Sequence, residues 1–116
     1  MPKPIQATYD TVRQIGLALP HAEEGTSYGT PALKAKGKLF VRLREDNETI
    51  VIRVPFEQRD EMMAADPEAY YITDHYAPYE YMLVRLTKVH PDALRDLIAA
   101  SHREALREYR KKRGER

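Results

Sequence analysis

The sequence predicts one α+β domain of two layers over residues 1–116, with helices covering one face of a five-stranded antiparallel sheet. Between residues 33 and 54, apolar and polar side chains alternate in three successive runs, which is the pattern of strands with one buried face. Near both ends of the chain, apolar residues recur at spacings of three or four, which is the pattern of amphipathic helices. The predicted order is helix, three strands, helix, two strands, helix.

The first helix is expected over residues 4–19, and Pro20 ends it because the residue before a proline is pushed out of the helical region. Its predicted buried face consists of Ile5, Tyr9, Val12, Ile15 and Leu19. Residues 20–32 are rich in glycine, proline and hydroxyl side chains, so we expect a loop there.

The next three segments are expected to be strands, over residues 33–36, 39–44 and 50–54. A short turn at Gly37-Lys38 closes the first two into a hairpin, and an acidic turn joins the second to the third. In the second strand, alternation predicts one face of core residues and one wet face: Leu39, Val41 and Leu43 inward, and Phe40, Arg42 and Arg44 outward.

The second half of the chain continues with a short helix over residues 56–65, stopped by Asp66-Pro67. A short strand near Tyr70–Thr73, a loop through Pro78 and a last strand over Tyr81–Leu86 follow. The final helix is expected to begin at His90-Pro91-Asp92, with proline in the first helical position, and to extend to about residue 110.

The composition excludes several classes of protein. The chain has 116 residues and no cysteine, which excludes a disulfide framework, a thiolate nucleophile and cysteine-ligated metals. The longest apolar runs are about five residues, against the ~20 that a membrane-spanning helix needs, so no membrane association is expected. The chain opens with no signal-peptide pattern, and a cytoplasmic location is therefore expected.

The charges are segregated although the formal net charge is only +1. A basic helical tail at about residues 103–116 carries +4, and residues 1–102 carry −3. The wet face of the strands is expected to collect cations, with one aromatic ring among them: Lys34, Lys36, Arg42, Arg44, Arg53, Arg85 and Phe40. Cations neutralise phosphates and aromatic rings stack on bases, so our leading hypothesis is a nucleic-acid-binding surface, with weak DNA binding.

Two alternatives stay open for this face. It could be an ordinary solvated surface, on which the cations pair with Glu45, Glu48, Glu57 and Glu80. It could also be a subunit interface that makes the protein a homodimer or receives a protein partner.

The residues give no sign of catalysis. None of the four histidines has a metal-ligand spacing to another, Ser27 lacks a nucleophile-elbow context, and Gly25 and Gly29 do not form a phosphate loop. We therefore expect no enzyme, no cofactor, no metal and no catalytic residue.

A second candidate site joins the loop at residues 23–31 to the segment at residues 73–79. Both are rich in groups that form directional hydrogen bonds, and a protein or small-ligand site there would use Glu24, Tyr28, Asp74, His75 and Tyr76. The alternative is that these residues only shape the chain and cap the edge of the core.

Several stretches of the sequence together resemble the MmcQ/YjbR family of small bacterial proteins, over roughly residues 5–105. They are Leu19-Pro20-His21-Ala22-Glu23-Glu24, Tyr28-Gly29-Thr30-Pro31, Gly37-Lys38-Leu39-Phe40, Thr73-Asp74-His75-Tyr76 and the strand Met82–Leu86. The resemblance implies the same element order, in a two-layer fold shared with type III secretion chaperones and likened to the frataxin-like fold. It also implies DNA binding through a double-wing arrangement, and it brings no catalytic residues.

Overall fold

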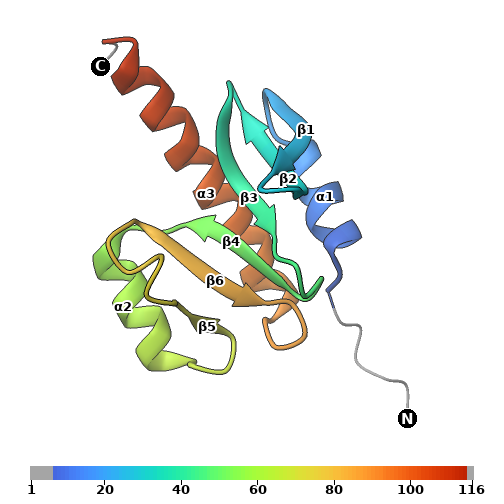
Figure 1. Cartoon of the computed structure of the whole chain (residues 1–116), viewed down its shortest axis with the longest axis vertical. Coiled ribbons are helices and arrows are strands. Elements are labelled where there is room, and N and C mark those ends of the chain that lie inside the picture. Colours follow the sequence, from blue (N-terminus) through green and yellow to red (C-terminus); the bar gives the residue numbers. More distant parts are fainter. Residues whose placement is uncertain (1–6, 115–116) are drawn as a thin grey trace.

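The sheet has six antiparallel strands, and the helices pack on one side of it (Figure 1). The structure is a computed structural model, and it describes residues 7–114. The elements in chain order are α1 (Tyr9–Leu17), β1 (Ala22–Ser27), β2 (Thr30–Ala35), β3 (Lys38–Leu43), β4 (Thr49–Arg53), α2 (Phe56–Ala65), β5 (Tyr70–Tyr71), β6 (Tyr81–Arg85) and α3 (Pro91–Lys112). The strand order is β1-β2-β3-β4-β6-β5.

Helix α3 organises the packing. It runs diagonally across β3 and β4 and extends past the sheet at its C-terminal end (Figure 1). Leu94 and Ile98 of α3 are fully buried against the apolar side chains of the central strands. Helix α1 packs beside α3 and over β1 and β2, where a Cβ at Gly16 would lie 2.3 Å from the Leu33 side chain. The helical glycine therefore permits this close approach.

The two-layer α+β class is confirmed, with six strands in place of the predicted five. The additional strand is β1, in the segment for which the sequence predicts a loop. It is an edge strand with four exposed central residues, so its sequence has no alternation of apolar and polar side chains. The turn to β2 consists of Tyr28 and Gly29, with φ angles of 52° and 79°, the geometry of a two-residue hairpin turn.

A β-bulge in β3 makes part of the predicted alternation wrong. Leu33 pairs with Val41 and Lys34 pairs with Leu39, so Phe40 is an extra residue in the ladder. Phe40 is fully buried, and its ring lies 5.3 Å from that of His102 in α3, so it faces the helices and not the wet face. The bulge also places Leu39 on the face of the sheet opposite the helices, which we call the open face. The alternation predicts Phe40 on that face instead.

The other elements differ from expectation mainly in length. Helix α2 has the predicted bounds, β5 is two residues long instead of four, and α3 extends two residues further than expected. Helix α1 is shorter than predicted: it begins at Tyr9, after the extended residue Thr8, and ends at Leu17, two residues before the predicted end. Its predicted beginning at residues 4–6, and residues 115–116 of the basic tail, lie outside the described residues.

Candidate functional site

A cavity of about 450 Å³ lies on the open face of the sheet, opposite α3. Val51 forms part of its floor, and it points away from the core because its neighbours Ile50 and Ile52 both belong to the core that α3 covers. The lining comes from β1, β3, β4, β6, the β1–β2 turn and the segment before β6: Ser27, Tyr28, Leu39, Arg42, Val51, His75, Tyr76, Tyr79 and Tyr81. We call this space the aromatic cavity.

Five aromatic rings line the aromatic cavity, and four of them touch one another. The His75 ring lies 4.8 Å from that of Tyr76, edge to face, and 6.4 Å from that of Tyr79. The Tyr76 ring lies 6.1 Å from that of Tyr81, again edge to face. Edge-to-face contacts stabilise such clusters by about 0.5–1.5 kcal/mol per pair, so the wall is a connected set of rings.

Arg42 provides the central polar group of the cavity. Its side chain is 6% exposed, and its guanidinium donates to the Ser27 carbonyl (3.1 Å), the Tyr76 hydroxyl (3.3 Å) and the Glu45 carboxylate (2.6 Å). These bonds use three of the five N–H groups of an arginine. A hydrogen bond from its own backbone, together with the one from Arg42, holds the pKa of Glu45 below its usual value. Glu45 is therefore ionised near neutral pH.

Tyr28 stands at the mouth of the cavity in a conformation that is costly for its side chain. It is 84% exposed, its φ is 52°, and its ring centroid lies 5.2 Å from the Arg42 guanidinium carbon. Positive φ favours glycine and asparagine, and an aromatic residue there costs about 1–3 kcal/mol. Because the ring is exposed, its burial offsets little of this cost. Another interaction is therefore needed to explain why tyrosine occupies this position.

Arg59 of α2 holds the segment that carries three of the rings. Its side chain is buried, and Nη1 donates to the carbonyls of Tyr79 (2.6 Å), Tyr81 (3.1 Å) and Tyr76 (3.3 Å), while Nη2 donates to that of Ala77 (3.2 Å). Hydrogen bonds from α2 therefore hold the backbone of this wall of the aromatic cavity in place.

The second candidate site is brought together in part. Tyr28, His75 and Tyr76 line the aromatic cavity, as the sequence predicts. Asp74 is exposed and does not line it, and the Glu24 carboxylate pairs with Arg13 of α1, on the other side of the edge strand.

Three of the six strand cations are engaged in internal contacts. Besides Arg42, the Arg53 guanidinium forms an ion pair with Glu108 of α3 (2.5 Å) and donates to the Leu39 carbonyl (2.5 Å). The Arg85 guanidinium lies 3.9 Å from the Tyr71 ring centroid and donates to the carbonyl of Glu68 (2.7 Å). The Arg53 side chain therefore links the sheet to α3, and the Arg85 side chain links it to the segment before β5.

The other three strand cations do not form one continuous group. Lys36 is exposed in the β2–β3 turn, with its ammonium nitrogen 5.9 Å from the centroid of the Tyr109 ring. Lys34 and Arg44 are half-buried, and Arg44 lies at the far end of β3 from the turn. With Phe40 in the core, the predicted basic surface is divided rather than continuous.

The candidate residues named from the sequence leave out Arg59 and five residues that line the cavity: Ser27, Leu39, Val51, Tyr79 and Tyr81. Tyr79 and Tyr81 belong to a cluster of five tyrosines within twelve positions, which is a usable signal. Leu39 is predicted to face the core because a bulge leaves no mark in the apolar pattern. Arg59 looks like an ordinary polar residue of a weakly patterned helix, and nothing in the sequence distinguishes it.

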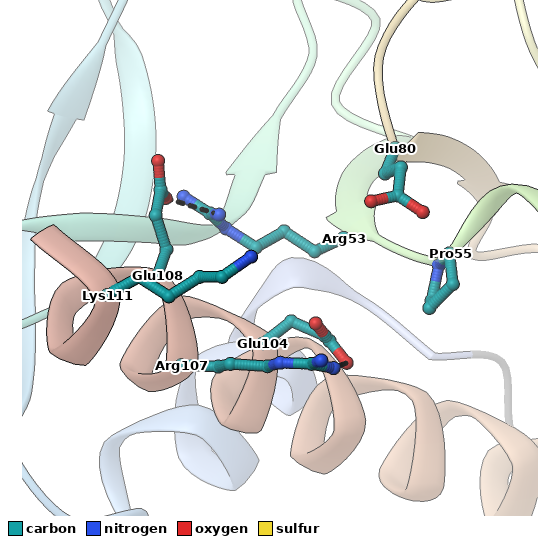
Figure 2. A pocket seen from close by; sticks show the side chains of 7 residues that line it. All are labelled: Arg53, Pro55, Glu80, Glu104, Arg107, Glu108 and Lys111. Atoms are coloured by element: carbon teal, nitrogen blue, oxygen red, sulfur yellow. Dashed lines mark ion pairs between the residues drawn. The ribbon is translucent and has the colours of Figure 1, made fainter. Parts of the chain in front are cut away.

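A second cavity of about 450 Å³ lies between α3, the end of β4 and the residue before β6 (Figure 2). Its charged lining is balanced, with three basic and three acidic side chains: Arg53, Arg107, Lys111, Glu80, Glu104 and Glu108. Arg53 pairs with Glu108, and Arg107 lies 3.9 Å from Glu104 (Figure 2). These internal pairs leave little net charge to attract a ligand.

The geometry of residues 7–114 bears on two other classes of site. Among these residues, no three histidine or acidic side chains are grouped so as to hold a metal ion. None of the helices described has both the length and the apolar character needed to span a bilayer.

The comparisons with known proteins agree with this fold. The model of the YjbR family matches residues 17–104. No match was found among curated proteins. The crystal structure of Deinococcus radiodurans protein DR2400, which contains a DUF419 domain, superposes with a TM-score of 0.78 at 22% identity, covering 100% of this chain and 94% of that one. The family match covers most of the sequence, and the chain therefore belongs to the YjbR family.

Proposed function

We propose that this protein is a binding module, without catalytic activity, that takes a small planar ligand into the aromatic cavity. The observation that carries the proposal is Tyr28, an exposed ring held at positive φ over the buried Arg42. Backbone strain persists where surrounding structure enforces it and is frequent in ligand clamps. A ligand sandwiched against this ring would explain why the turn carries tyrosine.

The dimensions and chemistry of the aromatic cavity support this function. Small-molecule sites are typically concave spaces of about 300–1,000 Å³, apolar and aromatic with a few polar groups, and this cavity falls within that range. Leu39 and Val51 give it an apolar floor, and the Arg42 guanidinium and the Tyr76 hydroxyl supply directional hydrogen bonds.

The surroundings of the reactive side chains support binding rather than catalysis. Among the described residues, the His75 ring packs against two tyrosine rings, and no acid or hydroxyl hydrogen-bonds it to orient it as a base. Ser27 accepts from Arg42 through its backbone carbonyl, and among the described residues no histidine hydrogen-bonds its hydroxyl.

The test is a panel of planar aromatic fragments, measured by calorimetry against the wild type and two turn variants. Tyr28→Asn removes the ring and keeps the turn, because asparagine followed by glycine is the preferred pair at such turns. Lys36→Asn is a matched control, since Lys36-Gly37 has the same signs of φ (53° and 77°) and does not line the aromatic cavity. We expect fragment binding that only Tyr28→Asn abolishes. Absence of binding by the wild type, or an equal weakening in both variants, would refute the proposal.

A second candidate function is nucleic-acid binding, at the end of the molecule rather than on the sheet face. Contact with the Lys112 side chain, burial and repulsion between the two charges hold the pKa of Lys38 below its usual value. Lys36 lies close by in the same hairpin, and Arg110 and Lys111 occupy the last turn of α3. Like charges gathered without enough acids to balance them suit a polyanion.

Salt titration of DNA binding tests this second candidate. The double variant Lys38→Gln/Lys112→Gln should reduce the slope of log affinity against log salt by about two, because each cation removed leaves one phosphate without its counter-charge. Lys88→Gln/Arg95→Gln removes the same charge near the opposite end of α3, whose 22 residues span about 33 Å, and should leave the slope unchanged. Equal slopes for the two variants, or no binding to single-stranded or duplex DNA at low salt, would exclude it.

A further inference from the structure

A smaller hollow adjoins the aromatic cavity. It has a volume of about 300 Å³, and it shares four lining residues with the aromatic cavity: Tyr28, Arg42, His75 and Tyr76. Arg44, Glu45 and Thr73 complete its lining. Because the two spaces share these walls, one ligand can extend from the first into the second.

Arg44 differs from the other arginines of the open face. Arg42, Arg53 and Arg85 each hydrogen-bond a carbonyl oxygen, and the first two also pair with carboxylates. Within residues 7–114, the Arg44 side chain makes no hydrogen bond or ion pair, and its Nε is buried without a partner. A buried donor without an acceptor costs about 1–3 kcal/mol, and a ligand acceptor can remove that cost.

The acids near Arg44 are committed to other groups. Glu45 accepts from the Arg42 guanidinium at 2.6 Å. Burial acts to raise the pKa of Asp46, but hydrogen bonds from the backbone of Glu48 and from Thr49, with the charge of Arg44, hold it below its usual value. Arg44 therefore acts on both carboxylates from a distance without forming a pair with either.

We propose that the ligand is a planar ring carrying an anionic group, with the ring in the aromatic cavity and the anion bound by Arg44 in the adjoining hollow. This inference rests on the proposed function, because it divides one site into a ring subsite and an anion subsite. Two arginines and one glutamate give the lining of the adjoining hollow a net charge of +1. The planar guanidinium offers paired donors that match a carboxylate or a phosphate, and the Thr73 hydroxyl adds another donor.

Two pairs of probes separate the subsites: adenosine with adenosine monophosphate, and naphthalenemethanol with naphthoate. Within each pair the ring is kept and an anionic group replaces a hydroxyl. We expect the anionic member to bind about tenfold more tightly, as one charge-assisted hydrogen bond implies. The phosphate pair and the carboxylate pair show which anion the subsite prefers, and an advantage in either pair supports the subsite.

Arg44→Gln should abolish the advantage of the anionic member while the neutral rings keep their affinity. Arg44→Lys keeps the positive charge but lacks the paired N–H donors of the guanidinium, so it should retain part of the preference for the anionic member. Arg95→Gln is the charge-matched control on exposed α3 surface and should behave as the wild type. Circular dichroism establishes whether each variant is folded. If Arg44→Gln is not folded, the comparison of Arg44→Lys with the wild type tests the proposal.

The outcomes distinguish the ring subsite from the anion subsite. Neutral rings that bind as tightly as their anionic partners, or an Arg44→Gln variant that weakens both members equally, would overturn the anion subsite and leave the binding module standing. Failure of all four probes to bind would overturn both.

Discussion

The Ser101 hydroxyl of α3 donates a hydrogen bond to the Phe40 carbonyl of β3 at 2.6 Å. The same oxygen accepts from the Arg53 backbone N–H of β4 at 2.9 Å. The last paired residues of β3 and β4 at this end of the ladder are Val41 and Ile52. Beyond them, the Ser101 hydroxyl connects the Arg53 N–H to the Phe40 carbonyl, in place of a direct bond between the strands. Helix α3 is thus fastened to the two central strands at the bulge that also turns Phe40 into the core.

Ser101→Ala should destabilise the fold by about 2 kcal/mol, because two backbone groups are left without their partner. Urea denaturation measures the effect, and Thr87→Ala, at an exposed turn, is the control. A destabilisation equal to that of the control would show that water or strand closure replaces the hydroxyl.

Tyr28→Asn should leave the free energy of unfolding unchanged or raise it by up to about 1 kcal/mol. Relief of the positive-φ cost is opposed by removal of the interaction between the ring and Arg42, which is worth about 0.5–1 kcal/mol at an exposed site. Lys36→Asn relieves the same strain and removes a more distant ring interaction, so it should gain at least as much. A Tyr28→Asn variant that is clearly destabilised would mean that the ring stabilises the free protein rather than binding a ligand.

Arg59→Met should release the segment before β6, because four carbonyl groups lose the hydrogen bond from Arg59. We expect faster hydrogen exchange at the amides of Tyr76 and Tyr79, and weaker fragment binding than in the wild type. Arg59→Lys keeps the charge and reaches fewer carbonyls, so its effects should be smaller. Unchanged exchange at these two amides would contradict the role given to Arg59.

The stability of the protein should fall in acid partly through Glu108. Burial acts to raise the pKa of this carboxyl, but the hydrogen bond and charge of Arg53 lower it overall. A carboxyl whose pKa is lower in the folded state stabilises the fold above its unfolded pKa, and the contribution is lost as pH falls below the ordinary value of 4.5. Denaturation of Glu108→Gln should therefore differ from the wild type at neutral pH and converge with it in acid. A difference independent of pH would indicate packing rather than charge.

The fold could be read from the sequence wherever burial is one-sided. Ile50 and Ile52 alternate with Val51 because one face of β4 meets α3, and α2 has the predicted bounds because proline and polar residues limit it. Strand β1 could not be read this way, since an edge strand with exposed residues has no apolar pattern. The bulge at Phe40 depends on the contact between β3 and α3. The residue of α3 that contacts Phe40 is Ser101, which lies 61 positions away in the sequence.

The site was predictable in its ingredients and not in its arrangement. Tyr28, His75 and Tyr76 stand out in the sequence as residues of two segments with directional side chains, and the fold brings them together. The sequence does not reveal that Arg42 is engaged by Glu45 while Arg44 is left without a partner, because both look like outward arginines of one strand. That distinction comes from three-dimensional contacts alone.

Binding of a planar ring by the aromatic cavity can be observed in an amide-resolved NMR titration with naphthoate. We expect saturable shifts concentrated at Tyr28, Arg42, Tyr76 and Tyr81, and no shift beyond the solvent blank when the Tyr28→Asn variant is titrated. Shifts confined to the β2–β3 turn and the end of α3, or no saturable shift at all, would contradict it.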